Sequence, residues 1–354
     1  MKNTYYCIGI MSGTSLDGVD LVYATLTSDE NYSYQILKTK TYVYSQEWLV
    51  ALKEAFHKKP VELIELDVRY GKYTGELAKQ FIIENSIEQI DFIASHGHTI
   101  FHKPEMGYTL QIGSGKEIAN ITQCKTICDF RTQDVKFGGQ GAPLVPVGDS
   151  LLFSDFDYCL NLGGFANVSY RRCSERLAYD ICPVNIVLNY YVQQYDLSFD
   201  EGGQIAKSGK VHESLLKALN ANSFYQQKPP KSLGFEFVSQ QIIPLIDTFD
   251  LALKDILRTF VEHAAIQISA VVNRKEKSKT LITGGGAYNS FLIERLQVLS
   301  ITEISIPEKD LVEFKEALIF GLLGLLKIEE KVNCLKSVTG ASKDHSSGAI
   351  YYPN

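Results

Sequence analysis

A short turn rich in glycine and hydroxyl side chains joins the first two apolar runs of the chain. The turn occupies residues 9–18, and the flanking runs 5–10 and 19–26 have the composition of β-strands. A hairpin turn of this kind gathers backbone N–H groups and hydroxyls around a small volume that suits an oxyanion such as phosphate. The same residue types also make ordinary hairpin turns, so this turn alone leaves both interpretations open.

Two further glycine turns follow predicted strands. Residues 163–167 separate strand 158–162 from strand 168–171, which repeats the plan of the first hairpin. Residues 284–287 lie between a buried strand and a helix, where glycine leaves room for a flat ligand or for tight packing. Strands and helices alternate along the chain, which predicts the α/β class, and the repeated hairpin indicates a duplicated domain. The first turn is not a Walker A loop, because no Gly-Lys-Ser or Gly-Lys-Thr follows it.

The length of 354 residues is typical of two domains. The segment 138–146 combines glycines with prolines and predicts the crossing between them. We therefore expect an N-terminal lobe of residues 1–140 plus 335–354, which carries the first hairpin. The C-terminal lobe, residues 141–334, then carries the second hairpin and the third glycine turn.

The composition narrows the classes of function. With 45% hydrophobic residues, 21% charged residues and a net charge of −6, the chain reads as a globular protein that does not bind nucleic acid. The most apolar helix candidate, residues 317–326, is about half of the ~20 residues that cross a bilayer, so we expect no membrane segment. Residues 5–11 are too short for a secretion signal, and the seven cysteines form no C-x-x-C pair. We expect a cytoplasmic protein with reduced thiols.

Polar side chains follow several other predicted strands. The segment 95–99 ends strand 90–95, and Arg131 closely follows strand 125–130. In α/β sheets ligand-binding residues lie at such strand ends. Asp180 follows a short strand and precedes the amphipathic helix 185–195. Taken alone, this position is that of a carboxylate near a helix N-terminus, which is a common structural feature.

In sequence and in order, these motifs resemble the anhydro-N-acetylmuramic acid kinase family. The most specific motif comprises Gly13, Thr14, Ser15, Leu16, Asp17, Gly18, Val19 and Asp20. The resemblance continues in residues 95–99, 110–113, 129–131, 138–146, 161–167, 284–287, 315–317 and 338–341. It covers nearly the whole chain. Residues 180–185 keep the Asp, Pro and Asn of the family's catalytic segment but replace its Thr and both of its Gly residues, which puts local contacts near residue 181 in doubt.

The resemblance implies the two-lobed actin, hexokinase and Hsp70 type of fold, which is ribonuclease H-like, with ATP in the cleft between the lobes. It implies an ATP-dependent kinase in which water opens the 1,6-anhydro ring of anhydro-N-acetylmuramic acid while O6 takes the γ-phosphoryl group. The product is N-acetylmuramic acid 6-phosphate, an intermediate in cell-wall sugar recycling. A homodimer is also implied. Two alternatives remain: another sugar or acyl kinase of the same fold, or a non-catalytic nucleotide-binding relative.

By the same resemblance, each motif acquires an expected role. Asp180 is the catalytic base, and Asp17 and Asp20 hold Mg²⁺. The ATP contacts are residues 13–20 together with Gly163, Gly164, Gly284, Gly285 and Gly286. The sugar contacts are Arg131, Glu316, His98 and Thr99. Arg131 suits the lactyl carboxylate because its guanidinium pairs carboxylates bidentately. Glu316 has a structural alternative as a first-turn helix carboxylate, and so do His96 and His98 as strand-end histidines.

Overall fold

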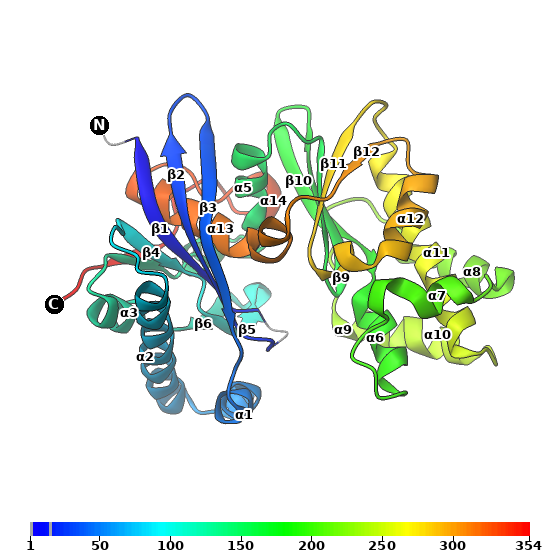
Figure 1. Cartoon of the computed structure of the whole chain (residues 1–354), viewed down its shortest axis with the longest axis horizontal. Coiled ribbons are helices and arrows are strands. Elements are labelled where there is room, and N and C mark those ends of the chain that lie inside the picture. The colour runs from blue at the N-terminus through cyan, green and yellow to red at the C-terminus, as the bar shows by residue number, and fades with distance from the viewer. Residues whose placement is uncertain (1–2, 14–15) are drawn as a thin grey trace. The chain divides into compact units, whose positions relative to one another are not determined.

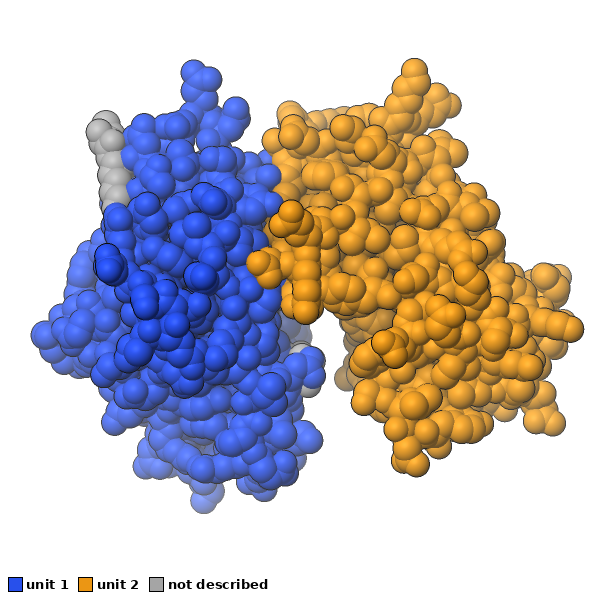
Figure 2. All heavy atoms as spheres, in the orientation of Figure 1, with its two compact units in different colours: residues 1–152, 314–354 blue, residues 153–313 orange. Residues whose placement is uncertain are grey.

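The chain forms two compact units (Figure 2). A computed structural model describes residues 3–13 and 16–354. Unit 1 comprises residues 1–152 and 314–354, and unit 2 comprises residues 153–313. The units divide at residues 152/153 and 313/314, outside the segment 138–146 in which the sequence predicted the crossing between domains. Helix α5 (Val145–Leu152) follows it within unit 1, where Gly148 packs closely against Ile319.

The first sheet lies in unit 1 and has the strand order β13-β7-β4-β1-β2-β3. Figure 1 labels its strands β1 to β4. Its strands are β1 (Thr4–Met11), β2 (Val19–Ser28), β3 (Tyr32–Tyr42), β4 (Phe92–Ser95), β7 (Thr126–Cys128) and β13 (Ala349–Tyr351). Strands β1, β2 and β3 form an antiparallel meander. Strand β4 runs parallel to β1, and β7 runs parallel to β4. A separate two-stranded sheet pairs β5 (His98–Lys103) with β6 (Tyr108–Ile112).

The second sheet lies in unit 2 and has the order β10-β9-β8-β11-β12. Its strands are β8 (Tyr158–Leu162), β9 (Phe165–Arg172), β10 (Glu175–Pro183), β11 (Lys279–Thr283) and β12 (Glu303–Ser305). Again three strands form an antiparallel meander and the next two run parallel to the first. In order of appearance the second sheet therefore reads 3-2-1-4-5, and the first sheet has the same order with β13 added as a sixth strand at its edge. This repetition confirms the predicted α/β class and the duplicated, ribonuclease H-like plan.

Helices cover these sheets. In unit 1 they are α1 (Gln46–Glu54), α2 (Pro60–Glu84), α3 (Gly115–Thr122), α4 (Thr132–Lys136), α5, α14 (Lys336–Thr339) and most of α13 (Lys309–Ile328). In unit 2 they are α6 (Asn185–Gln193), α7 (Gln204–Ser208), α8 (Glu213–Asn220), α9 (Phe235–Phe237), α10 (Ile243–Asp247), α11 (Leu253–Val272) and α12 (Ser290–Leu299). Single helical turns occupy Ala55–His57, Pro104–Met106, Glu201–Gly203, Ser223–Gln226, Val238–Ile242 and Gly285–Tyr288.

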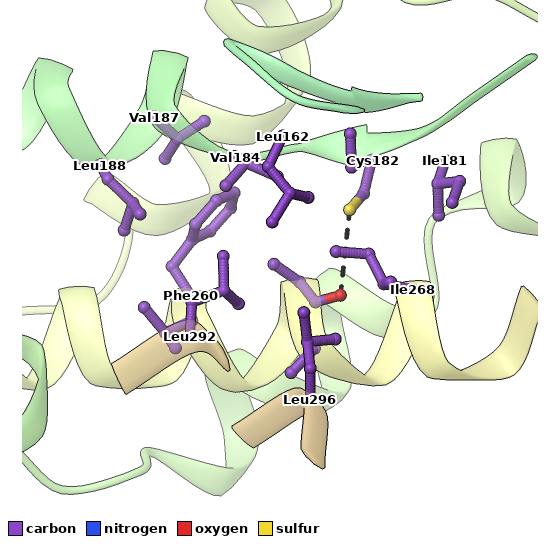
Figure 3. Packing of buried hydrophobic residues seen from close by; sticks show 14 of the residues in the cluster. Leu162, Ile181, Cys182, Val184, Val187, Leu188, Phe260, Ile268, Leu292 and Leu296 are labelled. Atoms are coloured by element: carbon purple, nitrogen blue, oxygen red, sulfur yellow. Dashed lines mark hydrogen bonds between the residues drawn. The ribbon is translucent and has the colours of Figure 1, made fainter. Parts of the chain in front are cut away.

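The core of unit 2 forms where α6, α11 and α12 meet the sheet (Figure 3). Phe260 and Ile268 of α11 and Leu296 of α12 are almost fully buried and pack with residues of the strands. Cys182 of β10 also lies in this core, and its Sγ is 4.0 Å from the carbonyl oxygen of Ala264. Because α11 is buried on most of its surface, most of its side chains are apolar.

Helix α13 packs directly on the first strand of unit 1. A Cβ atom at Gly9 would lie 1.9 Å from the carbonyl oxygen of Ala317, so only glycine allows this approach. The apolar residues of α13 from Leu318 to Leu326 are almost fully buried, which explains the hydrophobic run seen in the sequence. Among residues 3–13 and 16–354, no helix combines the length and apolar character needed to span a bilayer.

A charged cluster joins α11 to α12 in unit 2. Glu262 accepts hydrogen bonds from Arg258 Nη1 (2.8 Å), Arg295 Nε (2.8 Å) and Arg295 Nη2 (2.9 Å). Burial opposes its ionisation, but the hydrogen bonds from Arg295 and Arg258 outweigh burial and hold the pKa of Glu262 below its ordinary value.

We expect Glu262→Gln to lower the free energy of unfolding by about 1–3 kcal/mol at neutral pH, because hydrogen bonds to charged groups are lost. A carboxyl group with a depressed folded pKa stabilises above its unfolded pKa, and this contribution disappears as the pH falls through the folded value. Urea unfolding at pH 7 and in acid measures the difference between variant and wild type. A difference that persists unchanged in strong acid contradicts the ionic origin. Glu294→Gln on α12, which removes the exposed ion-pair partner of Lys207, should change stability much less.

Candidate active site

In unit 1 the predicted site residues follow the carboxyl ends of parallel strands. Strands β1, β4 and β7 run in the same direction and end at Met11, Ser95 and Cys128. The residues that follow them, 12–13, 96–97 and 129–131, therefore leave the same edge of the sheet. This edge is where open α/β sheets bind ligands. The fold thus brings together motifs that lie more than a hundred residues apart in sequence.

The first glycine turn is a hairpin, as predicted, since β1 and β2 pair from Met11 opposite Asp20. Asp17 is exposed, and Asp20 accepts a hydrogen bond of 2.6 Å from Thr41 Oγ1. The side chain of Val19 is buried in the core of unit 1, so any ligand contact at this position would come from its backbone. Thr14 and Ser15, which the sequence assigns to ATP, lie outside the described residues.

A buried network of hydroxyl groups holds Ser12, the residue that follows β1 in this hairpin. Ser12 Oγ lies 2.6 Å from Tyr44 Oη, 2.9 Å from Tyr70 Oη and 2.8 Å from His98 Nδ1. Burial lowers the pKa of His98 to about 4, so its ring is neutral at pH 7. The structure thus places His98 on the hairpin residue Ser12. The neighbouring Thr99 accepts a hydrogen bond of 3.3 Å from Gln111 Nε2.

Arg131 lies at the centre of a second polar cluster at this edge. Its Nε donates to His96 Nε2 at 2.9 Å, and its Nη1 donates to the carbonyl oxygen of Gly141 at 2.7 Å. Burial lowers the pKa of Arg131 to about 10, and the charge of Glu316 opposes this shift. Burial and the adjacent Arg131 charge keep His96 neutral by lowering its pKa well below the ordinary value. His96 therefore acts as an acceptor that orients Arg131.

Glu316 of α13 belongs to the same electrostatic environment. Burial raises its pKa, the positive charges of Lys315 and Arg131 oppose the increase, and the negative charges of Asp20 and Asp149 add to it. The charges of Arg131, a predicted sugar residue, and of Asp20, a predicted metal ligand, thus both act on Glu316 within unit 1. His98 and Thr99 have hydrogen-bond partners of their own.

A buried ion pair involves Lys315, the neighbour of Glu316 in α13. Lys315 Nζ lies 3.1 Å from Asp149 Oδ1, and both side chains are 4% exposed. The pair joins α13 to α5. Sequence reasoning noted Lys315 only as part of the 315–317 motif and missed Asp149, because nothing in the local sequence around residue 149 distinguishes it from a surface acid.

In unit 2 the two glycine turns meet at one sheet edge. Strands β8 and β11 are parallel and pair with Thr283 beside Asn161, so the turns that follow them are neighbours. Gly284 has a φ of +83°, and a Cβ there would lie 2.3 Å from Asn161 Oδ1. Gly286 packs similarly on Leu162, whereas a Cβ at Gly285 would meet no atom within 4 Å. The third turn therefore contains both alternatives considered from sequence: tight packing at two glycines and open space at the middle one.

The second hairpin also contacts the start of a helix. The backbone N–H groups of Val184 and Ile186, at the start of α6, donate to the carbonyl oxygen of Gly164 at 2.8 and 3.2 Å. Gly164 is exposed and Gly163 is partly exposed, and only distant atoms would meet a Cβ at either residue. Hydrogen bonds from α6 thus hold the backbone of this turn, and both glycines remain accessible to solvent.

Asp180 lies within β10, not after a strand as the sequence indicated. It pairs with Asn167 of β9, which pairs with Asn161 of β8, so Asp180 is in register with the edge that carries the glycine turns. Its Oδ2 accepts a hydrogen bond of 2.8 Å from the backbone N–H of Leu233. Burial raises the pKa of Asp180, and this hydrogen bond partly opposes the increase. A raised pKa brings a carboxylate closer to the range in which it serves as a base.

Sequence reasoning missed the loop that holds Asp180. The backbone N–H of Asp180 donates to the carbonyl oxygen of Lys231 at 3.1 Å, and Leu233 donates to the carboxylate. Lys231 Nζ in turn donates to the carbonyl oxygen of Phe224 and lies 4.2 Å from the centre of the Phe224 ring. The two adjacent prolines at 229 and 230 were the available signal, since they mark a constrained turn.

Comparison with known proteins identifies the family. A family model described as anhydro-N-acetylmuramic acid kinase matches residues 5–353. The chain belongs to this family. The membership confirms the resemblance seen in the motifs, and it covers both units.

Similar proteins span the same length. The chain is 31% identical over 370 residues to an anhydro-N-acetylmuramic acid kinase of Sulfurimonas denitrificans, covering 98% of this chain and 99% of the relative. It is 35% identical over 374 residues to one of Photobacterium profundum, covering 97% and 98%. Among solved structures, (R)-2-hydroxyglutaryl-CoA dehydratase component A of Acidaminococcus fermentans is similar with a TM-score of 0.48 and 13% identity, over 90% of this chain and 96% of that one.

Proposed function

We propose that this protein is an ATP-dependent kinase that converts anhydro-N-acetylmuramic acid to N-acetylmuramic acid 6-phosphate during cell-wall sugar recycling. In this reaction the oxygen of water bonds to C1 of the sugar and the C1–O6 bond breaks with its electron pair going to O6. O6 then takes the γ-phosphoryl group, ADP leaves, and a base accepts one proton from the attacking water. Sugar, water and ATP thus give the sugar phosphate and ADP. The observation that carries the proposal is the family match over residues 5–353.

Asp180 is the proposed base. Its carboxylate is in register with the glycine-turn edge of unit 2, and its raised pKa favours proton acceptance. The hydrogen bond from Leu233 fixes one carboxylate oxygen and leaves the other for a water molecule. Ile181, Cys182 and Val184, which replace the Thr and Gly residues of the family segment, are buried in the core of unit 2 and take no part in the hydrogen bond from Leu233.

The glycine turns are the proposed ATP contacts. The hairpin of residues 13–20 and the turn at Gly163 and Gly164 would hold phosphates through backbone N–H groups. The open position at Gly285 suits the flat adenine or the ribose, since no protein atom would meet even a Cβ there. Phosphoryl transfer depends mainly on such positioning and on charge stabilisation.

Asp17 and Asp20 are the proposed ligands of Mg²⁺, which would arrive with ATP and neutralise phosphate charge. Both offer carboxylate oxygens, which Mg²⁺ prefers, and Asp17 is exposed at the turn where phosphate would lie. Asp20 is already oriented by the hydroxyl of Thr41. The donor set therefore fits a hydrated Mg²⁺ bound through one or two carboxylates.

Arg131 and Glu316 are the proposed sugar contacts, with His98 and Thr99 supporting the same edge. Arg131 donates from Nε and Nη1 to groups of the protein. The N–H groups of Nη2 and the second N–H of Nη1 remain for the lactyl carboxylate. We also propose a cytoplasmic location and a homodimer, as the family implies. Sedimentation velocity of the purified chain measures the mass of the assembly.

Mass spectrometry of the product formed in ¹⁸O-water tests the proposed reaction. Protein, Mg²⁺-ATP and anhydro-N-acetylmuramic acid should give a sugar phosphate with one ¹⁸O at the anomeric carbon and none in the phosphoryl group. Phosphorylation without the label indicates a kinase that leaves the anhydro ring intact. ATP consumption only with other sugars indicates a different substrate, and ATP binding without turnover on any sugar indicates a non-catalytic relative.

Replacement of Arg131 by Lys tests the sugar assignment. We expect kcat/KM for the sugar to fall about 10- to 100-fold, because a lysine cannot reproduce the bidentate charged hydrogen bonds. The KM for ATP should stay the same. Steady-state kinetics with each substrate varied in turn measures both values. Arg69→Lys, at an exposed ion pair of the same unit, is the control and should behave as wild type. An equal rise in the KM for ATP contradicts the assignment.

A further inference from the structure

Three metal-ligating side chains that the proposed reaction does not use converge inside unit 1. Asp134 of α4, Cys334 and His345 each offer one ligand atom, and these atoms lie within 4.8 Å of one another. All three residues are buried. They come from separate parts of the sequence, so their convergence is a product of the fold.

Backbone pairing places the cysteine and the histidine side by side. The N–H of Cys334 donates to the carbonyl oxygen of His345 at 3.1 Å, and the N–H of His345 donates back to Cys334 at 3.2 Å. Residues that exchange both hydrogen bonds in an antiparallel bridge project their side chains to the same face. Asp134 lies opposite this face, with its Oδ1 3.6 Å from His345 Nε2.

The hydrogen bonds of His345 define which ring nitrogen is available. Its Nδ1 lies 3.1 Å from the carbonyl oxygen of Lys343, which can only accept, so Nδ1 carries a hydrogen. Nε2 is then the ring nitrogen that is available to a metal ion. Among residues 3–13 and 16–354, this buried Nε2 has no hydrogen-bond partner, and it lies 3.6 Å from a carboxylate oxygen of Asp134. The geometry thus offers a nitrogen and an oxygen ligand to one cation.

The carboxylate of Asp134 is oriented as metal-binding carboxylates are. Thr339 Oγ1 donates to Oδ1 at 2.8 Å, and the backbone N–H of Gly141 donates to Oδ2 at 2.7 Å. Each carboxylate oxygen has two lone pairs, so Oδ1 can still coordinate an ion. Hydrogen bonds that fix a ligand from behind, here on both the carboxylate and the imidazole, are a regular feature of protein metal sites.

We propose that Asp134 Oδ1, Cys334 Sγ and His345 Nε2 bind one zinc ion. A thiolate, an imidazole and a carboxylate together favour Zn²⁺ over Mg²⁺ or Ca²⁺. Tetrahedral bonds of about 2.0–2.3 Å place ligand atoms about 3.3–3.8 Å apart, so small side-chain rotations suffice. On binding, the Zn–S bond replaces the S–H bond of Cys334 and the proton passes to solvent. The fourth position is left for a water molecule.

This site has a structural consequence for the proposed sugar contact. The ion would join α4 to residues 334–345, and β13, which completes the first sheet, follows directly. The same Asp134 carboxylate holds the N–H of Gly141, and the carbonyl oxygen of Gly141 accepts the hydrogen bond from Arg131. Zinc should therefore stabilise both the C-terminal segment and the loop that positions Arg131.

Cobalt and zinc binding to the full chain tests the proposal. After removal of metals with a chelator, the wild-type protein should bind one Co²⁺ and show thiolate-to-cobalt absorption together with the visible bands of a tetrahedral site. One equivalent of Zn²⁺ should abolish this spectrum, appear as one zinc per chain in native mass spectrometry, and raise the thermal midpoint. A wild-type protein without one tightly bound equivalent, or a cobalt spectrum without thiolate absorption, overturns the proposal and leaves a His345–Asp134 ion pair.

Variants locate the site. Cys334→Ala and His345→Gln should each weaken zinc binding at least about 100-fold, since loss of a direct ligand exceeds the effect of losing a supporting one. Cys128→Ala removes another buried cysteine of the same unit and should bind zinc as wild type does. Undiminished binding by His345→Gln overturns the assignment. If either ligand variant fails to fold, the wild-type cobalt spectrum still decides, because it alone reports the thiolate ligand.

Discussion

Replacement of Asp180 by Asn is expected to lower the rate of product formation about 10²- to 10⁴-fold, the usual contribution of a general base. An amide cannot take the proton from the attacking water. The amide oxygen can still accept the hydrogen bond from Leu233, so the loop that contacts residue 180 should keep its position. ATP binding should therefore remain, because the proposed ATP contacts lie in the glycine turns. Product formation by mass spectrometry and ATP affinity by calorimetry measure the two effects separately.

The pH dependence of kcat/KM provides a second test of the same residue. Burial raises the pKa of Asp180, and a base works only when deprotonated, so activity should fall as the pH drops through this raised value. The acidic limb should thus lie above the ordinary aspartate range of about 3.9, and it should be absent from the residual activity of Asp180→Asn. Asp247→Asn, an exposed aspartate of the same unit that accepts a hydrogen bond from Tyr191, is the control and should keep full activity. Near-normal turnover of Asp180→Asn contradicts its role as the base.

Replacement of Lys315 by Met should lower the free energy of unfolding by about 3–5 kcal/mol, because removal of one partner leaves a buried carboxylate without its counter-charge. Lys315 and Asp149 are each 4% exposed, so water cannot take over the role of the missing ammonium group. Methionine has a similar length and fills most of the same space. Chemical unfolding of the full chain, followed by a signal from unit 1 such as the fluorescence of Trp48, measures the loss.

Two further variants separate the ion pair from general packing effects. The double variant Lys315→Met with Asp149→Leu should recover most of the lost stability, since an apolar pair often replaces a buried ion pair without cost. Lys309→Met removes a lysine that is 75% exposed and lies 3.8 Å from Glu313 on the same helix. This control should change stability by less than about 1 kcal/mol. If the double variant is less stable than Lys315→Met, the loss does not arise from the missing charge of Lys315 beside Asp149.

The sequence predicted most elements whose signal is local. The strands that flank residues 9–18 form where the apolar runs predicted them, and the predicted strand over residues 168–171 lies within β9, which begins earlier, at Phe165. The buried strand predicted before residues 284–287 is β11 (Lys279–Thr283). These elements follow from side-chain periodicity, which a single sequence contains. Their assembly into two sheets of the same order follows from the repeated hairpin.

Features that depend on distant contacts were not predictable in this way. The expected lobe boundary at residues 140 and 141 came from flexible residues, whereas the division at 152 and 153 results from the packing of α5 within unit 1. The ion pair of Asp149 with Lys315 spans 166 residues, and the link between Ser12 and His98 spans 86. Neither partner reveals the other in the sequence. The loop over Asp180 was missed for the same reason.

The connectivity of the two units has a consequence for the order in which a newly made chain can fold. Unit 2 is one continuous stretch, residues 153–313, inserted between the two segments of unit 1. The helix that packs on Gly9 of the first strand, and the strand that pairs with β7, are both synthesised after the whole of unit 2. Domains fold as units during synthesis, so unit 2 can be complete while the first sheet still lacks both. During synthesis the N-terminal strands therefore cannot complete their packing until the C-terminal residues have been made. The apolar face that α13 covers lacks this helix until then.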